Sequence, residues 1–348
     1  MHPHAKSLTT TARELVAPRK GILAADESTS TIKRRFDSIG VENTEANRRD
    51  YREMLFRAKG AADFISGVIL YDETIKQKAA DGTPLVQLLT SQGVMPGIKM
   101  DAGAKPLPFA PGETITEGLD GLRERLAEYA KFGARFTKWR AVIAIGDNIP
   151  SWYCIETNAH ALARYAALSQ EAGLVPIVEP EVLMDGDHGI DRCAEVTEMT
   201  LGEVFNQLRL QRVLLEGMLL KPNMVISAIK APNRATPELV AERTIAVFSR
   251  TVPSAVPGIV FLSGGQGDDE ATTNLQAINA QAKQAQAPWQ LSYSYGRGLQ
   301  AAPLKAWGGK SANVSAAQAA YLHRARLTSA AREGKYDPSM EKQAAAAG

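Results

Sequence analysis

The sequence contains very little cysteine and histidine, the residues that most often build disulfides and metal centres. Its only cysteines are Cys154 and Cys193, too few for a disulfide framework or a thiolate metal cluster. The five histidines show no ligand spacing beyond an N-terminal pair, and His188 is more typical of a loop residue than of a ligand. We therefore expect a reducing compartment, no bound metal and no other cofactor.

The chain also lacks a large excess of charge and any long apolar run. Lys and Arg number 40 against 38 Asp and Glu, a formal net charge of +2, which gives no case for binding nucleic acid or an acidic membrane. The N-terminus lacks the apolar core of a secretory signal, and no later run is long enough to span a bilayer. These absences predict a cytoplasmic protein whose partners are small molecules and whose anion sites are local.

What the sequence does contain is a repeated alternation of short apolar runs with longer amphipathic stretches. This alternation is typical of strand and helix units around a parallel sheet. Eight runs are expected to form strands, at Gly21 to Ala25, Phe64 to Leu70, Met95 to Met100, Ala134 to Ile143, Leu174 to Glu179, Pro222 to Ala228, Gly258 to Ser263 and Leu291 to Tyr295.

Helices are predicted between these strands. Apolar residues recur at helical spacing from Leu119 to Tyr129 and stop before Gly133, a plausible C-terminal glycine. Thr236-Pro237-Glu238 is a capping residue followed by a first-turn proline and an acidic residue. Further helices are expected at Asn158 to Gly173, Asp268 to Gln284 and Ser315 to Glu333.

Eight such units without a linker favour an α/β fold in one domain, a (β/α)8 TIM barrel over residues 1–348. No Gly-x-Gly-x-x-Gly motif opens a helix after the first strand, which weighs against the alternative, a doubly wound open sheet. A short arm is expected at about residues 1–10, and the polar, alanine-rich tail at about residues 335–348 is expected to be mobile.

Lys221 most needs an explanation, because it lies within the apolar run Leu219-Leu220-Lys221-Pro222-Asn223. Burial removes water from an ammonium group and so favours the neutral amine, which can attack a ketone or aldehyde to form a Schiff base. The ordinary alternative is a loop lysine whose stem packs while its charged end reaches water. The neighbours of Lys221 decide between these explanations.

Charged residues at other strand ends are expected to meet Lys221, since the carboxyl ends of barrel strands converge on one mouth. Lys138 and Arg140 share a strand face, as Glu179 and Glu181 do if their strand is long enough. A second cation at Lys138 would favour neutral Lys221, and Glu179 could move protons. For any single pair, a structural ion pair is an equal alternative. The other charged residues expected at the mouth are Asp26 and Lys99.

The loops after the last two strands predict a phosphate site. Ser263-Gly264-Gly265 lets backbone N–H groups approach an anion closely, and loops at this place in a barrel frequently bind phosphate. Arg297, after the eighth strand, can bind phosphate through two parallel hydrogen bonds. A Gly-Gly sequence alone is usually only a turn, so this prediction depends on the barrel.

Taken in order, these motifs resemble those of the class I fructose-bisphosphate aldolases, a family with a (β/α)8 barrel fold. The resemblance spans roughly residues 8 to 330. It rests on Gly21-Ile22-Leu23-Ala24-Ala25-Asp26-Glu27-Ser28, the Lys99 segment, Lys138-Trp139-Arg140, Val178-Glu179-Pro180-Glu181, Leu220-Lys221-Pro222-Asn223-Met224, Phe261-Leu262-Ser263-Gly264-Gly265-Gln266 and Tyr295-Gly296-Arg297.

The resemblance implies reversible aldol cleavage of fructose 1,6-bisphosphate to dihydroxyacetone phosphate and glyceraldehyde 3-phosphate, in glycolysis and gluconeogenesis. It implies that Lys221 forms the Schiff base with the C2 carbonyl and that Glu179 is the general acid and base. Asp26 would hydrogen-bond the substrate and the lysine, and Lys138 would line the reacting carbons. Glu181 is grouped with these catalytic residues on the same motif.

The resemblance also implies two basic ends to the pocket, for two phosphate groups. Substrate binding is assigned to Ser263, Gly264 and Arg297 at one end, to Lys99, Thr31 and Arg35 where the other end is expected, and to Arg140. Ser30 and Thr31 stand where many members have glycine and serine, so this loop is expected to make different contacts. The family is often tetrameric, so a homo-oligomer is expected.

One departure concerns the C-terminus. Many family members end in a tyrosine that helps proton exchange on the enamine, whereas here the last residue is Gly348 and the nearest tyrosine is Tyr336. Either another acid replaces this tyrosine, or proton exchange on the enamine is slow.

Two rival functions are open at this point. Another imine-forming barrel aldolase, of the transaldolase or deoxyribose-phosphate type, would not need basic groups at both ends of its pocket. A binding or scaffold protein that kept the barrel but lost catalysis would not need Lys221, Glu179, Asp26 and Lys138 together.

Overall fold

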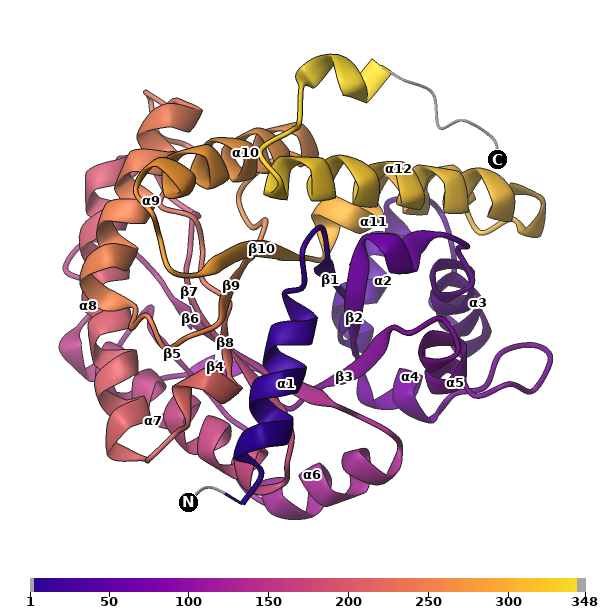
Figure 1. Cartoon of the computed structure of the whole chain (residues 1–348), viewed down its shortest axis with the longest axis horizontal. Coiled ribbons are helices and arrows are strands. Elements are labelled where there is room, and N and C mark those ends of the chain that lie inside the picture. Colours follow the sequence, from indigo (N-terminus) through magenta and orange to yellow (C-terminus); the bar gives the residue numbers. More distant parts are fainter. Residues whose placement is uncertain (1–2, 343–348) are drawn as a thin grey trace.

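Eight parallel strands close into a barrel in the structure, a computed structural model that describes residues 3–342. Their order around the barrel is β1-β10-β9-β8-β7-β6-β3-β2. The predicted (β/α)8 fold is confirmed (Figure 1). The barrel strands are β1 (Gly21–Ala24), β2 (Ile65–Leu70), β3 (Met95–Lys99), β6 (Phe136–Ile143), β7 (Val175–Val182), β8 (Leu219–Leu220), β9 (Gly258–Phe261) and β10 (Gln290–Tyr295).

Helices surround the barrel, and a small antiparallel pair, β4 (Ala104–Pro106) with β5 (Thr114–Thr116), follows β3. The α-helices are α1 (Ala5–Leu15), α2 (Thr29–Asp37), α3 (Glu45–Phe56), α4 (Asp72–Lys76), α5 (Leu85–Thr90), α6 (Leu122–Lys131), α7 (Trp152–Glu171), α8 (Ile190–Leu210), α9 (Pro237–Thr251), α10 (Asp268–Gln284), α11 (Arg297–Trp307) and α12 (Val314–Arg332). The predicted cap of α9 is present, because the Thr236 side chain accepts from the Leu239 N–H. Within residues 3–342, no helix is long and apolar enough to cross a membrane.

The sixth barrel strand was predicted too late in the chain. The sequence places it at Pro222 to Ala228, whereas β8 comprises only Leu219–Leu220. Pro222 has no N–H to donate to a neighbouring strand, and side chains take part in the next hydrogen bonds of the segment. The Val182 N–H donates to Asn223 Oδ1 at 3.0 Å, and the Val225 N–H donates to Thr244 Oγ1 at 3.0 Å. An apolar run can therefore be buried without joining the sheet.

The segment expected as an N-terminal arm contains the start of a packed helix. In α1, which crosses in front of the barrel in Figure 1, Leu8, Ala12 and Leu15 are fully buried. They join an apolar cluster with Phe136, the first residue of β6. Helix α1 therefore fills the end of the barrel opposite the carboxyl ends of the strands. The spacing of these three residues is helical, and it is the signal that the sequence analysis missed.

Part of the tail expected to be mobile is also packed. Glu341 accepts from Arg324 Nη1 at 2.6 and 2.7 Å, and the Tyr336 hydroxyl donates to Glu341 at 2.9 Å. Residues 335–342 are thus held against α12. The rest of that predicted tail, including Gly348, lies outside the described residues.

Candidate active site

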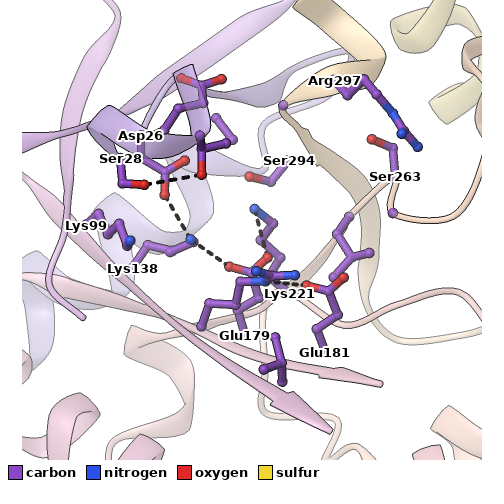
Figure 2. Close-up of a pocket in the computed structure, with 18 of the residues that line it drawn as sticks. Asp26, Ser28, Lys99, Lys138, Glu179, Glu181, Lys221, Ser263, Ser294 and Arg297 are labelled. Atoms are coloured by element: carbon purple, nitrogen blue, oxygen red, sulfur yellow. Dashed lines mark hydrogen bonds and ion pairs between the residues drawn. The ribbon is translucent and has the colours of Figure 1, made fainter. Parts of the chain in front are cut away.

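Four charged side chains from four strand ends form a continuous chain of contacts (Figure 2). Lys221 follows β8, Glu179 lies on β7, Lys138 lies on β6 and Asp26 follows β1. Lys221 Nζ lies 3.2 Å from Glu179 Oε1, and Lys138 Nζ lies 3.1 Å from Glu179 Oε2. Lys138 Nζ also donates to Asp26 Oδ2 at 2.8 Å. One carboxylate therefore joins the two lysines.

Lys221 is held inside the barrel mouth by its backbone. Its N–H donates to the Val178 carbonyl at 2.8 Å, which extends the pairing of β8 with β7 by one residue. The residue is only 4% exposed, so its ammonium group does not reach bulk water as a loop lysine would. A buried charge needs a partner, and Glu179 provides one for Lys221.

Opposite charges keep the neighbours of Lys221 ionised. Burial would raise the pKa of Asp26, but Lys138 and Lys221 hold it well below its usual range. Burial would also raise the pKa of Glu179, and the same two lysines lower it. Burial opposes the charge on Lys138, but Asp26 and Glu179 raise its pKa overall. At neutral pH the resting site therefore holds two carboxylates and a protonated Lys138.

The second charged residue on each of β6 and β7 also reaches the cavity. β7 continues past Pro180 to Val182, so Glu181 lies on the face of Glu179, as predicted. Glu181 Oε2 is paired with Arg140 Nε across the two strands. The Arg140 N–H donates to Asp101 Oδ2 at 3.2 Å, and Lys99 Nζ lies 3.2 Å from Asp101 Oδ1. These contacts bring the predicted Lys99, Arg140 and Glu181 together along one wall.

The loops after β9 and β10 meet at the start of α11. A Cβ on Gly298 would lie 3.2 Å from Ser263 Oγ, and a Cβ on Gly264 would lie 2.9 Å from Glu181 Oε1. Arg297 is exposed, and its Nη2 donates to the Gln266 carbonyl at 3.0 Å. In Figure 2, Ser263 and Arg297 lie on the side of the cavity away from Lys99. The cavity therefore has basic groups toward both ends.

Helix α2 brings hydroxyl and guanidinium groups to the same cavity. Ser28 Oγ, at its N-cap, lies 3.2 Å from Thr31 Oγ1. Arg35 Nη1 lies 2.5 Å from Glu27 Oε1. Arg35 also adjoins the β10–α11 junction, because its Nη2 lies 3.5 Å from the position of a Cβ on Gly296. Both predicted α2 residues thus face the cavity.

All the residues assigned by the sequence line one cavity of about 640 Å³, a volume suited to a small ligand. Sequence reasoning missed Ser28, Arg34 and Asp185, which also line it. The spacing from Ser28 through Thr31 to Arg34 is helical and could have indicated the first two; nothing in the sequence marked Asp185. In the part of the chain that the structure describes, no group of three or more His, Cys, Asp or Glu could hold a metal ion.

Comparisons with known proteins agree on one family. The family model described as fructose-bisphosphate aldolase class-I matches residues 7–348. A probable class 1 fructose-bisphosphate aldolase of Xanthomonas campestris is 54% identical over 332 residues, which cover 95% of this chain and 98% of that protein. A fructose-bisphosphate aldolase of Dictyostelium discoideum is 54% identical over 335 residues, 95% of this chain and 93% of that one.

A solved structure of an aldolase has the same fold as this chain. The fructose-bisphosphate aldolase of Plasmodium falciparum, solved in complex with TRAP and a small-molecule inhibitor, superposes with a TM-score of 0.95 at 50% identity. The match covers 97% of each chain. By its sequence, its barrel and its relatives, the chain belongs to the class I fructose-bisphosphate aldolase family.

Proposed function

We propose that this chain cleaves fructose 1,6-bisphosphate reversibly through a Schiff base on Lys221. The observation that carries the proposal is the contact chain from Asp26 through Lys138 and Glu179 to Lys221, in which each side chain lies within 3.2 Å of the next. Aldol cleavage of fructose 1,6-bisphosphate in glycolysis and gluconeogenesis is the activity of the family. The residue roles below are our assignments for this chain.

The first half of the reaction builds the imine. The Lys221 amine attacks the C2 carbonyl of the open-chain sugar, giving a carbinolamine. Glu179, 3.2 Å from Lys221 Nζ, is placed to relay the proton from the amine and to return one to the departing hydroxyl, which leaves as water. The resulting iminium ion draws electrons from C3, so the protein needs no separate electron sink.

The second half breaks the C3–C4 bond. Glu179 takes the proton of the C4 hydroxyl while the bonding electrons move into the iminium, giving an enamine and glyceraldehyde 3-phosphate. Proton return to C3 regenerates the iminium, and water then releases dihydroxyacetone phosphate and free Lys221. Lys138 supplies a fixed positive charge beside the reacting carbons. Asp26, 2.8 Å from Lys138, fixes that ammonium group and is placed to accept from a substrate hydroxyl.

Charge changes on Lys221 explain how one carboxyl can serve as both acid and base. The pKa of Glu179, which burial alone would raise, is lowered by Lys138 and Lys221. When Lys221 becomes neutral to attack the sugar, one of these positive charges is lost. The pKa of Glu179 then rises, and its carboxylate becomes a better proton acceptor at that step.

The two phosphate groups are assigned to the two basic ends of the cavity. Arg297 can form two parallel hydrogen bonds to one phosphate, beside Ser263 and the backbone at Gly264. Lys99 belongs to the opposite wall in Figure 2 and is assigned to the second phosphate, with Thr31 and Arg35 from α2 and Arg140 as further substrate contacts. Glu181 would act by holding Arg140 in place.

We further propose a cytoplasmic homo-oligomer, tetrameric as the family often is. The location is supported by a relative in Arabidopsis thaliana, 54% identical over 332 residues, that is named cytosolic.

Cleavage should persist in excess chelator, because the imine and not a metal ion withdraws electrons from C3. The measurement is the release of triose phosphates from fructose 1,6-bisphosphate by the purified chain, with and without EDTA. Unchanged initial rates are expected. Activity that EDTA abolishes and an added divalent metal restores would contradict the proposed mechanism.

A further inference from the structure

Glu27 follows Asp26 in the chain but serves a different set of groups. It is buried, and its two oxygens meet three donors. Oε1 lies 2.5 Å from Arg35 Nη1 and accepts from Gln300 Nε2 at 2.7 Å. Oε2 accepts from Arg52 Nη2 at 2.9 Å. The proposed reaction uses none of these contacts.

The two arginines that share this carboxylate differ in their surroundings. Arg52 is 1% exposed, and its Nε donates to the Ala25 carbonyl at 3.1 Å, so it is fixed behind the end of β1. The Arg35 side chain is 24% exposed and lines the cavity. Among residues 3–342, Glu27 is the only hydrogen-bond partner of the Arg35 guanidinium. Its other N–H groups are available to a ligand.

Gln300 connects Glu27 to the helix that begins with Arg297. Its Nε2 donates both to Glu27 and, at 2.6 Å, to the Ala24 carbonyl. Gln300 lies in the first turn of α11, the helix that begins with Arg297. Glu27 therefore binds Arg35 directly and, through Gln300, ties the first turn of α11 to the end of β1.

The charges of the cluster formed by Glu27, Arg35 and Arg52 do not balance. Two guanidinium groups share one carboxylate, so a net positive charge remains at the edge of the cavity. A guanidinium that is already oriented loses less side-chain entropy when it binds a phosphate than a free one does. An arginine without a fixed partner would sample several rotamers and would bind the same anion more weakly.

We propose that Glu27 is a positioning residue for phosphate binding, which orients the Arg35 guanidinium toward one phosphate group of the substrate and holds the first turn of α11 against the end of β1. This inference rests on the proposed function, since it concerns the sugar bisphosphate that the cavity takes. It assigns to Glu27 no contact with the reacting carbons.

A double-mutant cycle between Glu27 and Arg35 tests this directly. Glu27→Gln should raise KM for fructose 1,6-bisphosphate about tenfold, with a smaller change in kcat, and should raise the inhibition constant of inorganic phosphate in parallel. Arg35→Met should do the same. In the double variant Glu27→Gln should add less than about twofold, because the group that it positions is gone.

Two further variants keep the test decisive. Leu8→Ala, in α1 at the far end of the barrel, should lower the melting temperature without changing KM, which separates positioning from general loss of stability. If Glu27→Gln does not fold because Arg52 loses its buried partner, Gln300→Met replaces it in the cycle, with the same non-additive rise in KM expected.

Multiplicative effects of the two substitutions, or an unchanged phosphate inhibition constant in Glu27→Gln, would overturn the inference. Failure of the proposed function would look different, since the unsubstituted chain would then neither cleave the bisphosphate nor form an imine.

Discussion

Replacing Lys221 with methionine is expected to reduce kcat for fructose 1,6-bisphosphate cleavage by ~10⁵–10⁶-fold, the scale seen when a covalent nucleophile is removed. A thioether cannot form a carbinolamine or an imine, so the whole covalent route is lost. Any remaining rate would come from binding and from the charges of Lys138 and Glu179. The measurement is the release of triose phosphates at saturating substrate.

The fold should survive this substitution. Methionine fills much of the space of the buried lysine stem, and Glu179 keeps a charged partner because Lys138 lies 3.1 Å from its other oxygen. The circular dichroism spectrum should therefore match that of the unsubstituted chain. Lys305→Met, at an exposed lysine of α11, is the matched control and should keep full activity. A Lys221→Met protein with more than a tenth of the normal kcat would place the nucleophile elsewhere.

The second large effect is expected for Glu179→Gln, with a fall in kcat of ~10²–10⁴-fold, the range for loss of a general acid and base. An amide of nearly the same shape can occupy the space between Lys138 and Lys221 but can neither give nor take a proton at neutral pH. Both the dehydration of the carbinolamine and the cleavage of the C3–C4 bond should slow. Single-turnover measurements of imine formation and of triose release separate these two steps.

Aspartate at the same position provides the control for Glu179. Glu179→Asp keeps the carboxylate but shortens its reach, so it should recover part of the activity that glutamine loses. If Glu179→Gln formed the imine and cleaved the sugar at normal rates, proton transfer would have to be assigned to another group. Glu181, which lines the same cavity, would be the first to examine.

Much of this site could be predicted from residue types at strand ends. Lys138 and Arg140, two residues apart, share a face of β6, and Glu179 and Glu181 do so on β7. Because the carboxyl ends of barrel strands converge, these residues had to meet if the barrel was right. The glycine-rich turn after β9 and Arg297 followed from the same geometry.

Other features depended on contacts between residues far apart in the chain. The run after Lys221 is as apolar as a strand, and only its contacts show why it stays outside the sheet. The Asn223 side chain accepts from the Val182 N–H of β7, and the Val225 N–H donates to the Thr244 side chain. Glu27 gave no signal of its own, because its partners Arg52 and Gln300 lie 25 and 273 residues away. Distances such as that between Lys221 and Glu179 follow from the closed barrel and not from sequence spacing.

The most direct test of the central claim is borohydride reduction of the chain with dihydroxyacetone phosphate, followed by mass mapping of the peptides. Borohydride converts an imine to a stable secondary amine, so the reacting lysine keeps the sugar carbon skeleton. We predict one reduced adduct, on Lys221, together with loss of activity that depends on the triose phosphate. An adduct on Lys138 or Lys99 alone, or no adduct in a chain that still cleaves the bisphosphate, would contradict the Lys221 Schiff base.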